Sequence, residues 1–264
     1  MERKIGNEPE RKYEKIESLK TFERIGLPII PYKILDEKNF REEIAEFARK
    51  QSVDKIMVRT DGRGKDSPRL LDAPIDEETF KEIGNYFLNG YLVFVAHPGN
   101  IYRNLHSVNI RVADDESYME AVGPGFIASD LNRGNMPPHE TFSINPDDSS
   151  LQDRRIFANQ YERDRNERIN NSELEALRIN RSYLLAYSSY KELNDYELSV
   201  LEDAVVKLRA WKRANKKNNF IASMSFIDLG TSDNPGLKPV FWDIHEEAPI
   251  VRTVENKFYR HEGD

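Results

Sequence analysis

Cysteine is missing from this 264-residue chain, which excludes disulfides, thiolate zinc sites and a cysteine nucleophile. Long apolar runs are missing too, since no stretch approaches the roughly 18 apolar residues of a membrane span. The charged N-terminal residues have no apolar signal core. Positive charge is not in excess, because the formal net charge is −7, which argues against a general nucleic-acid binder. We therefore expect a cytoplasmic protein with no membrane or nucleic-acid partner.

Several familiar catalytic signatures are also missing. The sequence contains no Walker loop and no Gly-x-Ser-x-Gly nucleophile elbow. The spacing of His97, His106 and His139 matches no zinc pattern. We therefore expect each of these histidines to be an ordinary polar residue.

The residues that are present alternate between helical and strand patterns. Apolar periodicity and capping residues predict helices at 12–25, 37–50, 76–89, 172–189 and 193–215. Apolar runs bounded by glycine and proline predict strands at 29–35, 55–60, 91–96, 108–112, 117–122, 220–228 and 239–244. Residues 151–170 are so charged that they predict a solvated helix or a loop with helical bias. The alternation indicates a fold of mixed α and β class.

Two glycine-containing segments stand out. Gly123-Pro124-Gly125 follows an apolar run, and Asp61-Gly62-Arg63-Gly64-Lys65 follows the strand expected at 55–60. Glycine lets the backbone turn sharply and lets another molecule approach it closely. Two strands that each run into a glycine loop carrying arginine indicate a site for a phosphorylated ligand.

The order of these elements resembles the ATP-binding domain of phosphoenolpyruvate synthase and pyruvate phosphate dikinase, an ATP-grasp fold. The similarity rests on Lys15–Lys20 followed by Gly26–Pro31, on Val58-Arg59-Thr60 at a strand end, and on the closing Trp242–His245. It implies an α+β fold with mixed or antiparallel sheets flanked by helices, in two lobes.

The resemblance also divides the chain. It implies an N-terminal lobe at 1–95 and a C-terminal lobe at 96–264, with a charged helical insertion at about 145–190. ATP and Mg²⁺ would bind in the cleft between the lobes. The insertion, with its tyrosines near 183–190, is alternatively a surface for a partner protein.

Arg59 is the best candidate for a phosphate ligand, because its guanidinium can bind two oxygens at once and because Gly62 and Gly64 follow it. A salt bridge at a strand end is the competing interpretation. The resemblance implies Lys20 as a second cation, with Lys15 as its rival. Either lysine could instead be a solvated helix residue.

Glu120 precedes the second glycine turn, in which Gly123 and Gly125 would lie against the nucleotide. The resemblance implies that Glu120 holds a ribose hydroxyl or the adenine amino group, although a hairpin residue could equally face water. Arg133 follows the turn and could reach phosphate or an acyl substrate, which would make it, with Arg59, a catalytic cation. A pair between Asp130 and Arg133 is the structural alternative.

Asp228 and Asp243 fall on adjacent expected strands, where paired carboxylates could hold Mg²⁺ between the β- and γ-phosphates. Asp243 is the stronger candidate, because a carboxylate in an otherwise apolar strand needs a partner. The metal-binding glutamate of the family has no clear counterpart, and Ser223 or Ser225 stands near its position.

These residues predict an ATP-dependent enzyme without a covalent protein nucleophile. Its reaction would be phosphoryl transfer, as in a kinase-like transferase, or ligation through an acyl-phosphate, on a small acceptor that the sequence does not identify. A nucleotide-binding protein without turnover is the first alternative, favoured by the missing glutamate. A protein-interaction module that keeps the fold is the second.

Overall fold

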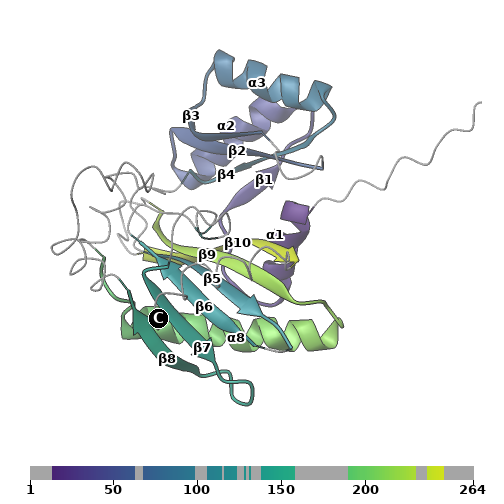
Figure 1. Ribbon diagram of the computed structural model, residues 1–264. Coiled ribbons are helices and arrows are strands. Elements are labelled where there is room, and N and C mark those ends of the chain that lie inside the picture. The colour runs from purple at the N-terminus through teal and green to yellow at the C-terminus, as the bar shows by residue number, and fades with distance from the viewer. Residues whose placement is uncertain are drawn as a thin grey trace, which may run out of the picture. The chain divides into compact units, whose positions relative to one another are not determined.

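The computed structural model describes residues 14–62, 68–98, 106–114, 116–123, 128, 131, 138–157, 190–229 and 237–246. These residues form two compact units, each with its own antiparallel sheet (Figure 1). Unit 1 comprises residues 1–17 and 30–98, and unit 2 comprises residues 18–29 and 99–264. The division differs from the expected boundary after residue 95 mainly in placing 18–29 with the second unit.

Unit 1 is a four-stranded sheet in the order β1-β4-β2-β3 with helices packed on one face. Its elements are α1 (Glu14–Arg24, whose first four residues belong to this unit), β1 (Tyr32–Ile34), α2 (Phe40–Gln51), β2 (Lys55–Asp61), β3 (Arg69–Pro74), α3 (Glu77–Leu88) and β4 (Leu92–Ala96). Alternate strand residues such as Val58 and Val95 pack against Ile44 of α2 and Ile83 of α3 in one apolar cluster. The other residues of each strand face away from the helices, because strand side chains alternate.

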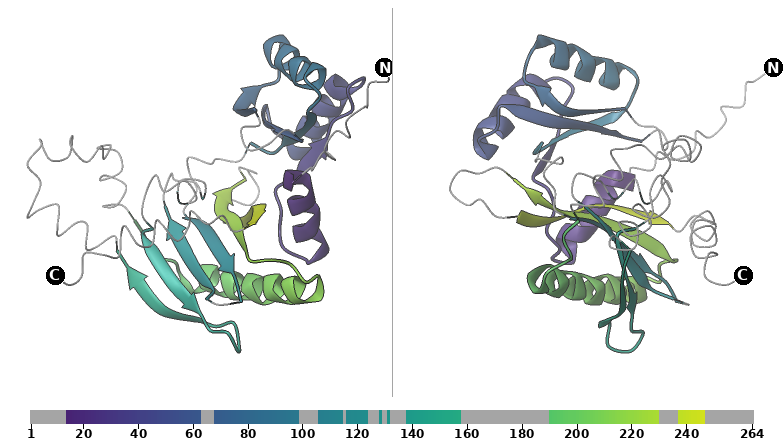
Figure 2. Two further views of the ribbon diagram at one scale, coloured as in Figure 1. Left: turned by 45° about the vertical axis from the view of Figure 1, so that its right-hand side comes forward. Right: turned by 60° about the vertical axis from the view of Figure 1, so that its left-hand side comes forward.

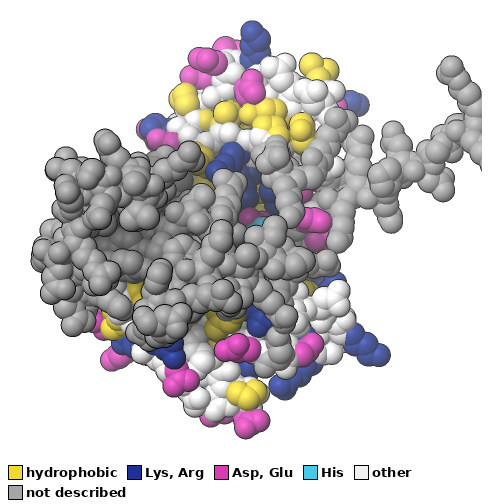
Figure 3. Space-filling view, viewed as in Figure 1, with side chains coloured by type: hydrophobic (Ala, Val, Ile, Leu, Met, Phe, Trp, Pro, Cys, Tyr) yellow, Lys and Arg dark blue, Asp and Glu magenta, His cyan; other side chains and the backbone are white. Residues whose placement is uncertain are grey.

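Unit 2 is a six-stranded sheet in the order β10-β9-β5-β6-β7-β8, and α8 runs along one of its faces (Figure 2). Its elements are β5 (His106–Val112), β6 (Tyr118–Val122), β7 (Glu140–Ile144), β8 (Leu151–Ile156), α8 (Asp195–Ala214), β9 (Phe220–Asp228) and β10 (Leu237–Glu246). Leu201, Val205 and Leu208 of α8 pack on Ile110 and Met224 of the sheet. The described surface around α8 and the β7–β8 hairpin carries intermingled acidic and basic side chains (Figure 3).

The segment 18–29 joins unit 2 through contacts with β10. Ser18 Oγ accepts a hydrogen bond from the Ile244 N–H at 3.0 Å. The rings of Phe22 and Phe241 pack with centroids 5.1 Å apart. Ile29 forms a parallel β-bridge with Phe241. The second half of α1 therefore buttresses the outer strand of the larger sheet.

The α+β class with antiparallel sheets is as expected, and the structure adds strands that the sequence patterns did not indicate. Strands β3, β7 and β8 were not expected. The helix or helix-biased loop predicted for the start of 151–170 is wrong, because Leu151–Ile156 is strand β8. The charged helical insertion expected at about 145–190 stays a prediction, because most of it, including the helix expected at 172–189, lies outside the described residues. Among those described, no helix is both long and apolar enough to cross a membrane.

Candidate functional site

A row of polar residues crosses the face of the six-stranded sheet that lies opposite α8. In the register of the strands, Asp243 pairs with Ser223, Ser223 with Asn109, and Asn109 with Glu120. Residues directly opposite each other in a sheet point to the same face. These four residues, from β10, β9, β5 and β6, therefore share one face, and we call them the polar row.

Side-chain hydrogen bonds fix the centre of the polar row. Ser223 Oγ donates to Asn109 Oδ1 at 2.8 Å, and Asn109 Nδ2 donates to the Ala128 carbonyl at 3.1 Å. One step along the same two strands, the hydroxyls of Ser107 and Ser225 lie 2.8 Å apart. Ser223 and Asn109 are both buried, so these bonds replace the water contacts that burial removes.

A β-bulge in β10 brings Asp243 into the polar row. Phe241 pairs with Met224 on the core face, but the next residue of β9, Ser223, pairs with Asp243, so Trp242 is the extra residue. Without the bulge, Asp243 would point to the same face as Phe241, because side chains two residues apart share a face. The bulge thus turns a carboxylate from the apolar core toward the polar row, as bulges next to functional sites often do.

The register separates the two aspartates that the sequence analysis placed together. Asp228 pairs with Leu237, whereas Asp243 pairs with Ser223, five residues further back along β9. Five residues of a strand span about 16 Å. This separation does not favour the expected Asp228–Asp243 metal pair, which stays a prediction, and the register places Ser223 beside Asp243.

The polar row fits Mg²⁺ only when the ion arrives with phosphate. Among the described residues no group of three or more histidine, aspartate or glutamate side chains could hold a metal by itself. The row nevertheless offers hard oxygen donors from Asp243, Ser223 and Glu120. Mg²⁺ is commonly held by one or two carboxylates together with substrate phosphates and water. Asp243 and Glu120 lie three strand spacings apart, about 14 Å.

In unit 1, the end of β2 collects polar and charged groups. Arg59 lies half-buried on this strand. Lys15 of α1 donates from Nζ to the Thr60 carbonyl at 2.8 Å. Asp61 accepts the Ile16 N–H at 3.0 Å, so a carboxylate of β2 stabilises the first turn of α1. Burial raises the pKa of the Asp61 carboxyl.

The two candidate lysines differ in their surroundings. Lys15 is half-buried and contacts the strand residue that follows Arg59. Lys20, the residue implied by the family resemblance, is exposed on the part of α1 that belongs to unit 2. Of the two candidate lysines, Lys15 is therefore the one that shares unit 1 with Arg59.

Two of the candidate glycines are described. Gly62 has a φ of 103°, a conformation that favours glycine, and its N–H donates to Asp61 Oδ1 at 3.0 Å. Gly123 is buried, and its N–H donates to His139 Nδ1 at 3.1 Å. The remaining candidates in the two loops, Gly64, Gly125 and Arg133, lie outside the described residues.

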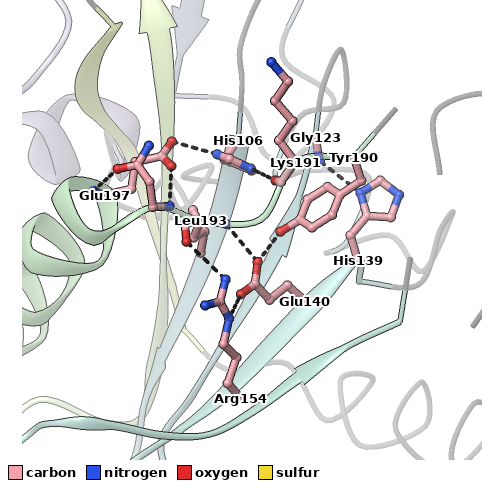
Figure 4. A network of polar contacts seen from close by, with 10 residues as sticks. His106, Gly123, His139, Glu140, Arg154, Tyr190, Lys191, Leu193 and Glu197 are labelled. Carbon is pink, nitrogen blue, oxygen red and sulfur yellow. Dashed lines mark hydrogen bonds and ion pairs between the residues drawn. The ribbon is translucent and has the colours of Figure 1, made fainter. Parts of the chain in front are cut away.

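Gly123 is attached to a buried polar network beside the sheet (Figure 4). The His139 ring packs on Tyr190 at 4.7 Å between centroids, and the Tyr190 hydroxyl donates to Glu140. Glu140 also accepts from Arg154 and from the Leu193 N–H at 3.2 Å. Burial lowers the pKa of His139 to about 3, which keeps Nδ1 free to accept the Gly123 N–H at neutral pH.

A second buried contact completes this network. His106 Nδ1 lies 2.7 Å from Glu197 Oε1, and its Nε2 lies 2.5 Å from the Lys191 carbonyl. Glu197 is also the third residue of α8, and its carboxylate accepts a hydrogen bond from the Asn194 N–H. His106 thus has partners at both ring nitrogens, and His139 has one at Nδ1.

Sequence reasoning missed two residues of these sites. Asn109 lies within an expected strand, and its signal is the alternation of Ser107, Asn109 and Arg111 with apolar neighbours. Arg69 lies on the unexpected strand β3 and pairs with Arg59. No residue pattern marked Arg69, because its strand was not recognised.

Comparison with known proteins gave fold likenesses to solved structures alone. No family model matches the chain, and no curated protein matches it. D-alanyl-alanine synthetase A from Vibrio cholerae is 8% identical with a TM-score of 0.48, over 89% of this chain and 54% of that one. A RiPP-associated ATP-grasp ligase from Chryseobacterium gregarium, in complex with ADP and a leader and core peptide, is 12% identical with a TM-score of 0.42, over 90% and 53%.

The macrocyclase MdnC from Microcystis aeruginosa, bound with the precursor peptide MdnA, is 11% identical with a TM-score of 0.40, over 87% of this chain and 52% of that one. The chain therefore spans about half the length of these three structures. The resemblance to the ATP-binding domain of phosphoenolpyruvate synthase and pyruvate phosphate dikinase, which rests on sequence motifs, stays a prediction. All three TM-scores lie below 0.5.

Proposed function

We propose that this chain binds ATP with Mg²⁺ and uses it, in the manner of ATP-grasp enzymes, for ligation or phosphoryl transfer to a small acceptor. The observation that carries the proposal is the polar row, in which the β10 bulge aligns Asp243 with Ser223, Asn109 and Glu120. Asp243 and Glu120 thereby share one sheet face. The sequence predicts that Asp243 binds the metal at the phosphates and that Glu120 binds the ribose or the adenine.

The roles of these residues follow from their chemistry. Asp243 would hold the Mg²⁺ that accompanies the phosphates, and a bound ion would supply neutralisation of the charge on the transferred group. Glu120, three strands away, accepts hydrogen bonds from ribose hydroxyls or the adenine amino group. Arg59 binds phosphate oxygens through its guanidinium fork. Such a site acts by positioning and charge neutralisation, without a protein nucleophile.

A second candidate function is nucleotide binding without turnover. Ser223 stands beside Asp243, near the place where the family resemblance implies a glutamate, so one carboxylate is paired with a hydroxyl there. Loss of one of two acidic ligands would weaken the binding of a second Mg²⁺ more than it would weaken the binding of the nucleotide. Binding would then survive while transfer slows.

The test is thermal unfolding of the chain with and without excess ATP and Mg²⁺, for the unchanged protein and for Asp243→Asn. At about 100 times its dissociation constant, a ligand adds roughly 2.7 kcal/mol of stability. We expect Asp243→Asn to lose the Mg²⁺-dependent part of this gain. The control is Asp203→Asn, which removes an exposed α8 carboxylate paired with Lys207 and should leave the gain unchanged.

Two results would overturn the proposal. One is the absence of any ATP-dependent stabilisation in the unchanged protein, and the other is an equal gain in both variants. Mass spectrometry of the nucleotide then separates the two candidate functions. Conversion of ATP to ADP or AMP with an added acceptor library supports the enzyme, and intact ATP in the stabilised complex supports binding without turnover.

A further inference from the structure

The loop between β7 and β8 holds a serine in a backbone conformation that favours glycine. Ser149 has a φ of 66°, in the left-handed region that residues with side chains rarely adopt. The Ser149 N–H donates to the Asn145 carbonyl at 3.1 Å, and the Asn145 N–H donates to the Ser150 carbonyl at 2.9 Å. A glycine would take this position at a lower conformational cost, which points to a role for the serine hydroxyl.

The hydroxyl of Ser149 lies against a buried arginine of α8. Arg209 Nη1 donates to Ser149 Oγ at 3.0 Å and also to the Asn145 carbonyl. Only 8% of Arg209 is exposed, and among the described residues no carboxylate forms an ion pair with it. Burying a charge is costly unless an opposite charge offsets it. The two oxygens that Arg209 contacts are neutral, so the guanidinium keeps its full positive charge beside Ser149.

A second arginine lies one helical turn further along α8. Arg213 is exposed, and it forms no ion pair within the part of the chain that the structure describes. Residues four apart are neighbours on a helix surface, so Arg213 and Arg209 lie on one side of α8. Burial lowers the pKa of Arg209, and the charge of Arg213 lowers it further. The two positive charges are therefore close enough to repel each other.

Asp148 is the nearby carboxylate, and it is turned toward the residue after Ser149. Its Oδ1 accepts from the Ser150 N–H at 2.9 Å and from Ser150 Oγ at 2.7 Å. The charge of Asp148 raises the pKa of Arg209, but burial and Arg213 together outweigh it. One exposed carboxylate offsets at most one of the two guanidinium charges, so the surroundings of Ser149 remain favourable for an anion.

We infer that Arg209 and Arg213 form a binding site for a phosphoryl group carried on Ser149. A phosphoserine has close to two negative charges and three strong acceptor oxygens at neutral pH. Guanidinium groups bind such oxygens through paired N–H donors. Because Arg209 already contacts the oxygen that would carry the phosphorus, the added group lies within reach of the guanidinium. None of these residues belongs to the polar row, so the site is separate from the proposed nucleotide site.

The modification is an ordinary phosphoryl transfer to a hydroxyl. The Ser149 O–H bond is replaced by an Oγ–P bond, and the donor is a nucleoside triphosphate. The bond between its terminal phosphorus and the bridging oxygen breaks, so the nucleoside diphosphate leaves. The hydroxyl proton passes to a base of the kinase that acts on the chain.

The test measures how tightly the phosphate holds its second proton, by phosphorus NMR titration of the full chain phosphorylated at Ser149. The reference is a synthetic peptide of residues 143–153 with the same phosphoserine, which keeps the local aspartates and lacks both arginines. Nearby positive charge favours the doubly ionised phosphate. We expect the affinity for the second proton to be about tenfold lower in the folded chain than in the peptide. Equal affinities would overturn the inference.

Two variants of the phosphorylated chain separate the site from general charge. Arg213→Gln removes the exposed arginine of the site, and we expect it to raise the affinity for the second proton about threefold, as for an exposed ion pair. Arg24→Gln is the matched control, because it removes an exposed arginine from the last turn of α1. It should leave the affinity unchanged. An equal rise in both variants would assign the effect to overall charge and overturn the inference.

Thermal unfolding gives an independent readout. A tenfold lower proton affinity in the folded state corresponds to about 1.4 kcal/mol of added stability once the phosphate is fully ionised. We therefore expect phosphorylation of Ser149 to raise the Tm by about 2–4 °C at pH 8, and by less in Arg213→Gln. A lower Tm after phosphorylation would show that the phosphate disrupts the β7–β8 loop, and would overturn the inference.

Discussion

The contact that the buried side chain of His139 makes depends on the protonation state of its ring. Its Nδ1 accepts the Gly123 N–H, so the ring contributes this contact only while it is neutral. Burial favours the neutral form and lowers the pKa of His139 to about 3. An unfolded histidine has a pKa near 6.5. Between these two values the unfolded chain binds a proton at this residue and the folded chain does not.

Acid should therefore destabilise the protein through His139. Stability rises with pH wherever the unfolded state holds more protons, so we expect the contribution to be complete above about pH 6.5 and to shrink as pH falls toward about 3. The slope contributed by this group approaches about 1.4 kcal/mol per pH unit. Urea unfolding between pH 7 and pH 4 measures it.

His139→Gln supplies the comparison for this pH series. Glutamine does not titrate but can still accept a hydrogen bond, so the variant should lose free energy of unfolding less steeply as pH falls. His245→Gln serves as the control, because His245 is exposed on β10. Identical slopes for the unchanged protein and His139→Gln would contradict the prediction.

The candidate residues could be predicted from sequence where chemistry and local pattern coincide. Asp243 stands out as a carboxylate within an apolar strand, and Glu120 stands out because it precedes a glycine turn; the register places both in the polar row. Asp228 looks equivalent to Asp243 by the same criterion. The register that separates it from Asp243 is set by hydrogen bonding between β9 and β10, which sequence composition does not encode.

At the scale of elements, α8 owes its start to a reciprocal cap. The Asn194 side chain accepts the Glu197 N–H, and the Glu197 carboxylate accepts the Asn194 N–H, both at 3.0 Å. These bonds satisfy N–H groups that have no partner within the helix. The cap therefore fixes where the longest described helix begins.

Removing this cap should cost stability without changing the fold. We expect Asn194→Ala to lower the free energy of unfolding by about 1 kcal/mol, the usual cost of a lost N-cap. Asn215→Ala is the control, because Asn215 stands at the other end of α8 with an exposed hydrogen bond to the Trp211 carbonyl. Chemical denaturation measures both. An equal loss of free energy of unfolding in the two variants would show that the capping box stabilises the protein no more than the hydrogen bond of Asn215 does.

Sequence patterns predicted elements whose local signals are strong. For α8 the capping residues and apolar stripe agree, and the expected strand 220–228 matches β9 residue for residue. Strand β8 could not be found this way, because residues 152–155 are all exposed polar or charged residues. Its strand state comes from pairing with β7, a tertiary contact that overrides its composition.

At the scale of the whole molecule, each unit carries its own apolar core. One cluster joins α2 and α3 to the four-stranded sheet, and the other joins α8 and part of α1 to the six-stranded sheet. Ile83 is fully buried in the first cluster and Leu208 in the second. A defect in one core should therefore be felt first within its own unit.

Hydrogen exchange measured by mass spectrometry can test this separation. We expect Ile83→Ala to cost about 3 kcal/mol of local stability, as for a large-to-small core substitution, and to speed exchange in β1–β4. Leu208→Ala should do the same in β5–β9. Acceleration that spreads equally over both sheets in either variant would mean that the two cores unfold as one cooperative unit.

Strand β8 also bears on how the protein behaves at high concentration. It is one of the two edge strands of the six-stranded sheet, and an open strand edge is a template on which another chain can add. Asp153 has a φ of 49° and Arg154 and Arg155 follow it, next to a break in the pairing register with β7. A kinked, charged border of this kind is a poor surface for edge-to-edge stacking. The same composition that hides β8 from sequence analysis thus protects the sheet against growing into an aggregate.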